Sequence, residues 1–373
     1  MKHESYDIAI IGGGILGLAH AVWAAESGKT VVVFERQPKA FGASIRNFGL
    51  VWPIGQPAGN LYDRAMRSRE KWLDIAQKAG FWANPVGSLH LAYHADELAV
   101  LEEYTTRFGR ECVLLKPEEV LEKAPYVQTN GLLAGLYSST EVTVNPTRAI
   151  HSISDWLNTN ERVDQRFLEE VQQVETGQVV TSKETIQAEH IIICGGDEFQ
   201  TLYPDVFEDS PLIKSKLQMM RTFALDDPTP FGPTVCGGLT LQHYASFGQC
   251  ESLHILKERY KNELSEYLDW GIHVMATQNE FGQLVIGDSH EYGMGFDPFN
   301  RDEVNQLILD YLEGLISVPY QIGETWYGVY AKNTQGTEFV HSPEDRVHIV
   351  TGVGGAGMTF SFGLAEEVLS TIL

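Results

Sequence analysis

The sequence has few cysteines and few positive charges for its 373 residues. None of the cysteines forms a C-x-x-C or Cys/His pattern; they are Cys112, Cys194, Cys236 and Cys250. A disulfide scaffold is therefore excluded, no metal site is indicated, and a reducing, cytoplasmic location is expected. Lysine and arginine number 27 against 50 aspartates and glutamates, a formal net charge of −23. Such a surface repels phosphate backbones and anionic lipids, so we expect neither nucleic acid nor a membrane as a partner.

Long apolar runs are also scarce, and the longest uncharged one, residues 8–25, has two possible interpretations. It could be a signal peptide or a membrane span. However, Gly12, Gly13 and Gly14 interrupt it, and the β-branched run TVVVFE follows at the spacing of a second strand. The segment is better explained as a strand, a turn and a helix.

Strand–glycine–helix patterns occur at both ends of the chain, in YDIAIIGGGILG and in VHIVTGVGGAG. The first begins a βαβ unit and therefore a parallel sheet. We predict an α/β fold: a Rossmann-like nucleotide-binding domain with an inserted α+β substrate domain on an antiparallel sheet. The expected limits are 1–84, 135–215 and 333–373 for the first domain, and 85–134 with 216–332 for the second.

Three helices are predicted from local signals. Apolar spacing indicates an amphipathic helix over residues 61–80. Asn145 and Pro146 are typical of an N-cap and first helical position. Residues 304–316 follow the 3.6-residue period, with Asn300 and Glu303 placed like a capping box.

The glycines at the first turn carry the cofactor signal. Gly12, Gly14 and Gly17 satisfy G-x-G-x-x-G between a strand and a helix, where the helix N-terminus attracts a pyrophosphate. Glu35 ends the next strand, at the place of a ribose-binding acid. NAD and FAD proteins share this fingerprint. The second glycine segment, with Gly354, Gly355 and Gly357 before a helix, favours a flavin, because reduced flavin concentrates negative charge.

With these motifs, the sequence resembles the D-amino-acid oxidase-like family of FAD oxidoreductases over its whole length. The resemblance implies that the Rossmann-like domain is an FAD-binding domain of the D-amino-acid oxidase type. The resemblance also covers GASIRNFG and IIICGG. It implies roles in binding FAD for a set of residues that follow the family pattern: Gly12, Gly14, Ile15, Leu16, Gly17, Glu35, Arg36, Ser44, Arg46, Asn47, Val171, Gly195, Gly196, Gly354, Gly355, Gly357, Met358 and Thr359. More narrowly, RNFGLVWPIGQP, KLQMMRT and VIGDSHEYG are similar to a bacterial branch associated with aminophosphonates, relatives of 2-aminoethylphosphonate.

Two departures from the family pattern affect the expected chemistry. The strand before the last glycine loop reads WYGVYAKNT, without the arginine that usually clamps an amino-acid carboxylate. No cysteine follows Cys250, so we expect non-covalent FAD. The expected reaction is oxidation of the C–N bond of a small anionic amine, with O2 as the expected electron acceptor, although the sequence does not distinguish it from other acceptors. The alternatives are a glycine, sarcosine or D-amino-acid oxidase-like enzyme, and a non-catalytic flavin-binding protein.

The candidate substrate-site residues each have a structural alternative. Arg46 could belong wholly to the cofactor, Arg221 could form a surface ion pair, and Lys332 could be a solvated loop residue. His290 could simply cap a turn, and Tyr330 could be a core aromatic. The oligomeric state is left open by the sequence.

Overall fold

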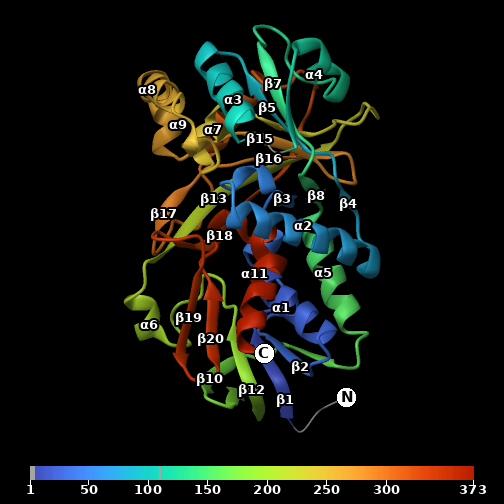
Figure 1. The fold of residues 1–373 in the computed structure, drawn as a ribbon, viewed down its shortest axis with the longest axis vertical. Coiled ribbons are helices and arrows are strands. Elements are labelled where there is room, and N and C mark those ends of the chain that lie inside the picture. The colour runs from blue at the N-terminus through green and yellow to red at the C-terminus, as the bar shows by residue number, and fades with distance from the viewer. Residues whose placement is uncertain (1–4, 109–110) are drawn as a thin grey trace.

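The computed structural model describes residues 5–108 and 111–373 and contains two large sheets that follow one another along the long axis of the molecule (Figure 1). A small third sheet consists of β3 (Leu50–Val51), β8 (Val142–Val144) and β4 (Ala83–Asn84).

The first large sheet has a parallel centre that combines both ends of the chain. Its central strands, in spatial order, are β20 (Val347–Thr351), β12 (Thr185–Ile193), β1 (Ser5–Ile11), β2 (Val31–Glu35) and β9 (Val163–Phe167). The antiparallel strands β10 (Val171–Glu175), β11 (Gln178–Thr181) and β19 (Phe339–Glu344) extend it. In this register Ile10 lies opposite both Val33 and Ile192. Such β-branched runs are typical of parallel strands that are covered on both faces.

Four helices pack on one face of this sheet and on one another. They are α1 (Ile15–Glu26), α2 (Asn60–Ala79), α5 (Pro146–Leu157) and α11 (Gly357–Ile372). Ile8 and Ile10 pack into the core under these helices, whereas Ala9 belongs to the core on the other face, which also contains Phe207 of α6 (Pro204–Glu208). The alternation of side chains along a strand thus places β1 between two cores.

The second large sheet is almost wholly antiparallel; its one parallel pair is β14 with β5. Its spatial order is β17 (Glu291–Gly293), β13 (Leu212–Ala224), β16 (Gln283–Gly287), β15 (Met275–Gln278), β14 (Thr234–Cys236), β5 (Ser88–Ala92), β7 (Ala134–Ser138) and β6 (Cys112–Leu115), with β18 (Ile322–Asn333) also paired to β13. The β13–β18 pairing extends from Leu212 opposite Asn333 to Thr222 opposite Ile322.

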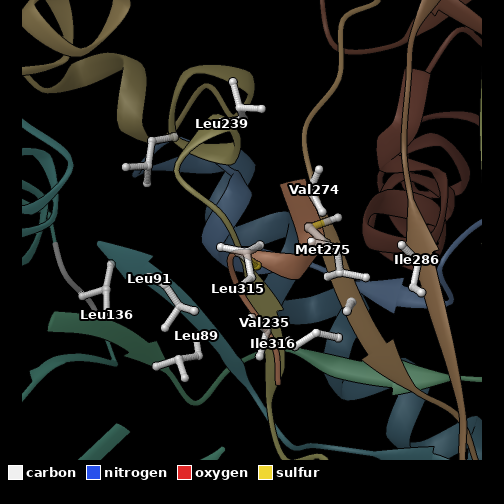
Figure 2. Close-up of a cluster of buried hydrophobic side chains, with 14 of the residues drawn as sticks. Leu89, Leu91, Leu136, Val235, Leu239, Val274, Met275, Ile286, Leu315 and Ile316 are labelled. Carbon is white, nitrogen blue, oxygen red and sulfur yellow. The ribbon is translucent and has the colours of Figure 1, made fainter. Parts of the chain in front are cut away.

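A hydrophobic core lies between this sheet and its helices. Figure 2 shows part of it, where Leu89 and Leu91 of β5 lie near Val235, Met275 and other apolar side chains. The surrounding helices are α3 (Ala95–Arg107), α4 (Pro117–Lys123), α7 (Leu239–His243), α8 (Leu253–Glu263), α9 (Ser265–Asp269) and α10 (Asp302–Glu313).

The local helix predictions agree with the structure except at the two ends of α10, which ends at Glu313 and not at residue 316. Helix α2 covers the expected stretch and ends at Gly80 in a left-handed conformation, and Asn145 Oδ1 accepts a hydrogen bond from Arg148 N at the start of α5. The capping box at Asn300 is wrong: α10 begins two residues later, and Arg301 N donates instead to Gln218 Oε1 of β13, at 2.7 Å. The side chain of Gln218, from a distant strand, thus takes the place of the expected local cap of the helix.

The expected domain limit at residue 135 also needs correction, because it cuts through β7. This strand hydrogen-bonds with β5 and β6 in the second sheet. The uncharged run over residues 8–25 forms β1, a turn and α1. Among the residues that the structure describes, no helix combines the length and apolar character needed to cross a membrane.

The buried His90 of β5 makes stability depend on pH. Its ring packs against Trp52 and Phe247, neither ring nitrogen has a hydrogen-bond partner among the described residues, and burial lowers its pKa to about 3. The unfolded chain takes up a proton here below about pH 6.5, but the folded chain does not until near pH 3. Lowering the pH from 7 to 5 should therefore cost about 2 kcal/mol of unfolding free energy at this residue.

We predict that His90→Leu removes this contribution, so that the variant loses less stability between pH 7 and pH 5 than the native protein. Urea unfolding at the two pH values measures the difference. His254→Gln, at an exposed position of α8, is the control and should leave the pH dependence unchanged. An identical pH dependence in His90→Leu and the native chain would contradict the prediction.

Candidate functional site

The turn between β1 and α1 requires glycine at two positions. Gly12 has φ +109°, and a Cβ there would lie 2.3 Å from the carbonyl oxygen of Cys194 at the end of β12. A Cβ at Gly17 would lie 1.9 Å from the carbonyl oxygen of Gly12. Both distances are shorter than any real contact, so the turn closes only without these side chains. This leaves the N-terminus of α1 open to a ligand, as a pyrophosphate site requires.

Glu35 is held at this turn by the backbone. Its Oε2 accepts a hydrogen bond from Gly13 N and its Oε1 accepts one from Gln37 N, both at 2.9 Å. The carboxylate therefore sits beside the glycine turn, where ribose hydroxyls of a dinucleotide would lie. Its role in binding ribose remains a prediction.

A cavity of about 770 Å³ extends from this turn to the second sheet. Its volume falls within the range of roughly 300–1,000 Å³ that is usual for ligand and cofactor sites. Of the residues expected to bind FAD, Gly17 alone is absent from its lining, because it packs against Gly12 instead. The lining includes Gly12, Gly14, Ile15, Leu16, Glu35, Arg36, Ser44, Arg46, Asn47, Val171, Gly195, Gly196, Gly354, Gly355, Gly357, Met358 and Thr359.

Residues 43–49 form one wall of the cavity. Ser44 Oγ, in the short helix η1 (Ala43–Ile45), accepts a hydrogen bond from Ile15 N at the start of α1. Asn47 shapes the loop: its Nδ2 donates to Ala43 O at 2.9 Å and its Oδ1 accepts from Gly49 N at 2.7 Å. By contrast, the Arg46 guanidinium makes no hydrogen bond or ion pair with any described residue, so its charge is available to an anion.

The C-terminal glycine segment forms the opposite wall and is anchored at two points. After η4 (Gly354–Ala356), Met358 O accepts a hydrogen bond from Trp72 Nε1 at 2.7 Å. Thr359 Oγ1 accepts one from Trp52 N at 3.0 Å. The start of α11 thus faces the cavity in a fixed position, and its N-terminal dipole favours a negative group there.

Two predicted substrate-site residues lie at the far end of the cavity, on β18. Tyr330 and Lys332 both line it, next to the glycine segment. Lys332 Nζ donates a hydrogen bond to Tyr292 Oη at 3.2 Å and lies 4.5 Å from the centre of that ring. Burial raises the pKa of Tyr330, so it stays protonated and can donate a hydrogen bond.

Arg221 is placed elsewhere. It lies on β13, pairs with Glu324 of β18 and contacts the Trp326 ring, and it is not among the residues that line the cavity. This is the surface ion pair that was the structural alternative for Arg221, and the structure gives no support for a substrate role.

His290 does line the cavity, together with two histidines that sequence reasoning missed. His243 ends α7 and His273 precedes β15. The ring centres lie 3.8 Å apart for His243 and His273, 4.8 Å for His243 and His290, and 5.4 Å for His273 and His290. We call these three residues the histidine cluster. Their spacing in the sequence follows no local pattern, so only the fold of the second sheet brings them together.

A buried carboxylate accompanies the histidine cluster. Asp288 Oδ1 lies 2.9 Å from His273 Nε2, and Oδ2 lies 3.9 Å from His290 Nε2. Burial acts to raise the pKa of Asp288, but the neighbouring His273 and His290 outweigh it and lower the pKa overall. Desolvation in the cavity lowers the pKa of His290, which is buried, and also that of His243. At neutral pH the site therefore holds an ionised carboxylate beside the neutral imidazoles of His243 and His290.

Comparison with known proteins identifies the same type of fold. A family model described as FAD dependent oxidoreductase matches residues 7–370. The aerobic glycerol-3-phosphate dehydrogenase of Staphylococcus saprophyticus is 29% identical over 152 residues, which cover 36% of this chain and 26% of that protein. The match thus spans about a quarter of the length of this curated relative.

Two solved structures are similar over nearly their whole length. L-proline dehydrogenase from P. horikoshii has a TM-score of 0.79 and 21% identity, covering 100% of this chain and 94% of the other. Glycine oxidase from Geobacillus kaustophilus has a TM-score of 0.78 and 19% identity, covering 99% and 95%. At this level of identity the likeness shows the fold alone.

We predict that Gly14→Ala weakens FAD binding at least tenfold while the protein remains folded. The added Cβ would lie 3.0 Å from Ser44 Oγ, on the cavity wall where a pyrophosphate approaches the start of α1. Titration of the apoprotein with FAD measures the affinity, and circular dichroism checks the fold. Gly248→Ala is the matched control, because a Cβ there meets no atom within 4 Å. Equal affinities in the two variants would contradict the prediction.

Proposed function

The chain belongs to the FAD dependent oxidoreductase family, and on this premise we propose that it oxidises the C–N bond of a small anionic amine, specifically an aminophosphonate related to 2-aminoethylphosphonate. FAD supplies the redox chemistry: when bound, it takes a hydride equivalent from the carbon that carries the nitrogen. The resulting imine hydrolyses to an aldehyde and ammonia, or to an aldehyde and an amine when the nitrogen carries a methyl group. The protein has to orient the amine, keep it neutral and pair its anionic end.

FAD fits the cavity described above. The glycine turn admits a pyrophosphate at the start of α1, and Glu35 stands where a ribose would lie. The second glycine segment presents the start of α11 to the far end, where a flavin ring carries negative charge when reduced. The redox ring would therefore lie next to β18 and the histidine cluster, and the substrate would bind among the side chains of the second sheet.

The observation that carries the substrate proposal is the charge at that end of the cavity. Among the described residues that line the cavity, the arginines are Arg36 and Arg46, both from the first 47 residues and close to the FAD motifs. The second sheet contributes Lys332 and no arginine to the lining. Arginine suits the planar, bidentate pairing of a carboxylate, whereas lysine is a point charge that serves a tetrahedral anion equally well.

A phosphonate carries up to two negative charges, so one lysine leaves charge to be neutralised. Arg46 has a guanidinium without any partner among the described residues and lines the same cavity. If Arg46 pairs only with the FAD pyrophosphate, the anionic end of the substrate would be neutralised by Lys332 and by the positive end of the α11 dipole. We therefore assign the anionic end of the substrate to Lys332, with Arg46 as a shared cation.

We predict that anaerobic addition of 2-aminoethylphosphonate or its N-methyl derivative bleaches the oxidised flavin absorbance, at least tenfold faster than glycine or sarcosine at equal concentration. Stopped-flow absorbance measures the rates. Faster reduction by glycine, sarcosine or a D-amino acid would reject the phosphonate in favour of the amino-acid alternative. Full FAD occupancy with no bleaching by any amine would indicate a flavin-binding protein without this activity.

Lys332→Met should raise the KM for the active amine at least tenfold and change kcat less, because it removes a contact made in both ground and transition states. Steady-state kinetics separates the two constants. Arg221→Met, at the ion pair outside the cavity, is the matched control and should leave both unchanged. A Lys332→Met enzyme with native KM would remove Lys332 from the substrate site.

We also predict that FAD is bound without a covalent link. Acid precipitation of the yellow protein should release the flavin into the supernatant, where its absorbance is measured. Yellow colour that remains in the washed pellet would contradict the prediction.

A further inference from the structure

We propose that the histidine cluster is the receptor for the substrate's ammonium group and takes one of its protons before the C–N bond is oxidised. The reaction follows from the proposed function. The recognition does not depend on whether the anionic end of the substrate is a phosphonate or a carboxylate.

The contacts around the cluster indicate which nitrogens are free. His273 Nε2 lies 2.9 Å from Asp288 Oδ1, where an imidazole lone pair would repel the carboxylate, so Nε2 carries the hydrogen and Nδ1 is the acceptor. That Nδ1 is buried and has no partner among the described residues. His290 Nδ1 lies 3.1 Å from Gly271 O and must donate to it, which leaves Nε2 as the acceptor. The ring of His243 makes no hydrogen bond with any described residue. Each of the three imidazoles thus has a nitrogen lone pair that no hydrogen-bond donor of the described residues faces.

Distances identify the group that these acceptors suit. One nitrogen from each of the three rings can be chosen so that all lie within 4.8 Å of one another. A tetrahedral ammonium with hydrogen bonds of about 2.9 Å places its acceptors about 4.7 Å apart. A tetrahedral metal with bonds of about 2.05 Å requires ligand nitrogens only about 3.4 Å apart. The limit of 4.8 Å accommodates the acceptor spacing of an ammonium group.

The orientation of the rings agrees with this choice. The rings of His243 and His273 are tilted against each other, with centres 3.8 Å apart and an angle of 32° between planes. Rings that share a tetrahedral metal are held about 5 Å apart, because each lone pair points from the ring edge to the ion. Two rings as close as His243 and His273 can still accept hydrogen bonds at their edges from two different N–H groups of one ammonium.

The charges also favour a cation at this place. Asp288 is 5% exposed and its pKa is lowered, so it brings a negative charge into the cavity wall. Lys332 is the nearby positive charge, and it helps to lower the pKa of both His243 and His290. An ammonium group next to Asp288 and an anion next to Lys332 would each meet the opposite charge. The cavity therefore matches a substrate with both groups.

The proton step follows from the same geometry. One N–H bond of the ammonium breaks, its proton passes to an imidazole nitrogen, and the electron pair stays on the amine nitrogen. The neutral amine can then stabilise the loss of hydride from the neighbouring carbon, which the ammonium form cannot. Asp288 acts as a positioning residue: it fixes the tautomer of His273 and stabilises the imidazolium that forms.

The test compares ligands with and without the ammonium group. Calorimetry of the FAD-loaded protein would use 2-aminoethylphosphonate against ethylphosphonate, and glycine against acetate. His243→Phe keeps a flat ring but removes the acceptor, and His254→Gln is the control on the surface of α8. We expect His243→Phe to weaken binding of the amine at least tenfold and to leave its deaminated analogue within twofold, for whichever pair binds. Equal losses for both members of a pair would overturn the proposal and assign the cluster to the anionic end.

A pH profile separates a positioning role for Asp288 from a structural one. The rate of flavin reduction should fall at acid pH, where the imidazoles are already protonated. Asp288→Asn removes the charge that stabilises the imidazolium, so this acid limb should move to lower pH. An unmoved limb, or its loss together with the fold, would overturn the role of Asp288.

The metal alternative is tested directly on the native protein. Zn²⁺ should bind with no measurable heat, and a chelator should leave amine binding unchanged. Micromolar or tighter Zn²⁺ binding that His243→Phe abolishes would overturn the proposal. If the active amine proves to be glycine rather than an aminophosphonate, the substrate proposal fails while the glycine and acetate pair still decides the role of the cluster.

Discussion

The approach of Gly12 to the end of β12 is the contact on which the cofactor site depends. The carbonyl oxygen of Cys194 occupies the space that a Cβ would need, and Gly17 packs against Gly12 in the same way. This contact joins the turn after β1 to a strand about 180 residues later. Strand β20, from the C-terminal end of the chain, pairs with that same strand. The FAD cavity therefore exists only when three distant segments are in the sheet. A ligand that binds this folded edge and not the unfolded chain must stabilise the whole domain.

The parts of this fold that could be predicted from the sequence are those with local causes. The glycine turn, the helix that ends at Gly80 and the cap at Asn145 each depend on residues a few positions apart. The start of the helix after Asn300 could not be predicted from neighbouring residues. Its backbone N–H at Arg301 donates to the side chain of Gln218, which lies on the distant strand β13. The strand β7 was divided by the expected domain limit for a similar reason, since its partners β5 and β6 decide which sheet it joins.

The candidate site shows the same division. Residues of the FAD motifs lie together because each follows a strand or precedes a helix of the parallel sheet, which is a pattern visible in sequence. His243 and His273 have no such signal. Only His290 lies in a segment, VIGDSHEYG, that resembles a branch of the family. Their convergence needs the β13–β16–β15 order of the second sheet and the position of α7. Arg221 was a reasonable candidate by its strand alone, but its side chain leaves the cavity and meets Glu324.

Lys332 connects the two halves of the site. It lies on β18, pairs by a backbone bridge with Val353, and its side chain passes within 3.6 Å of the place of a Cβ on Gly354. The cation proposed for the substrate and the glycine segment proposed for the flavin are therefore fixed to each other. In a protein with a net charge of −23, such a local cation must act at short range, because charges beyond about 10 Å are largely screened at 0.1 M salt. Pairing of an anion by His243 or His290, whose pKa values are lowered, would require each ring first to take up a proton against its desolvation. The proposed division of the cavity, with Lys332 for the anion and the imidazoles for the ammonium, follows from that difference.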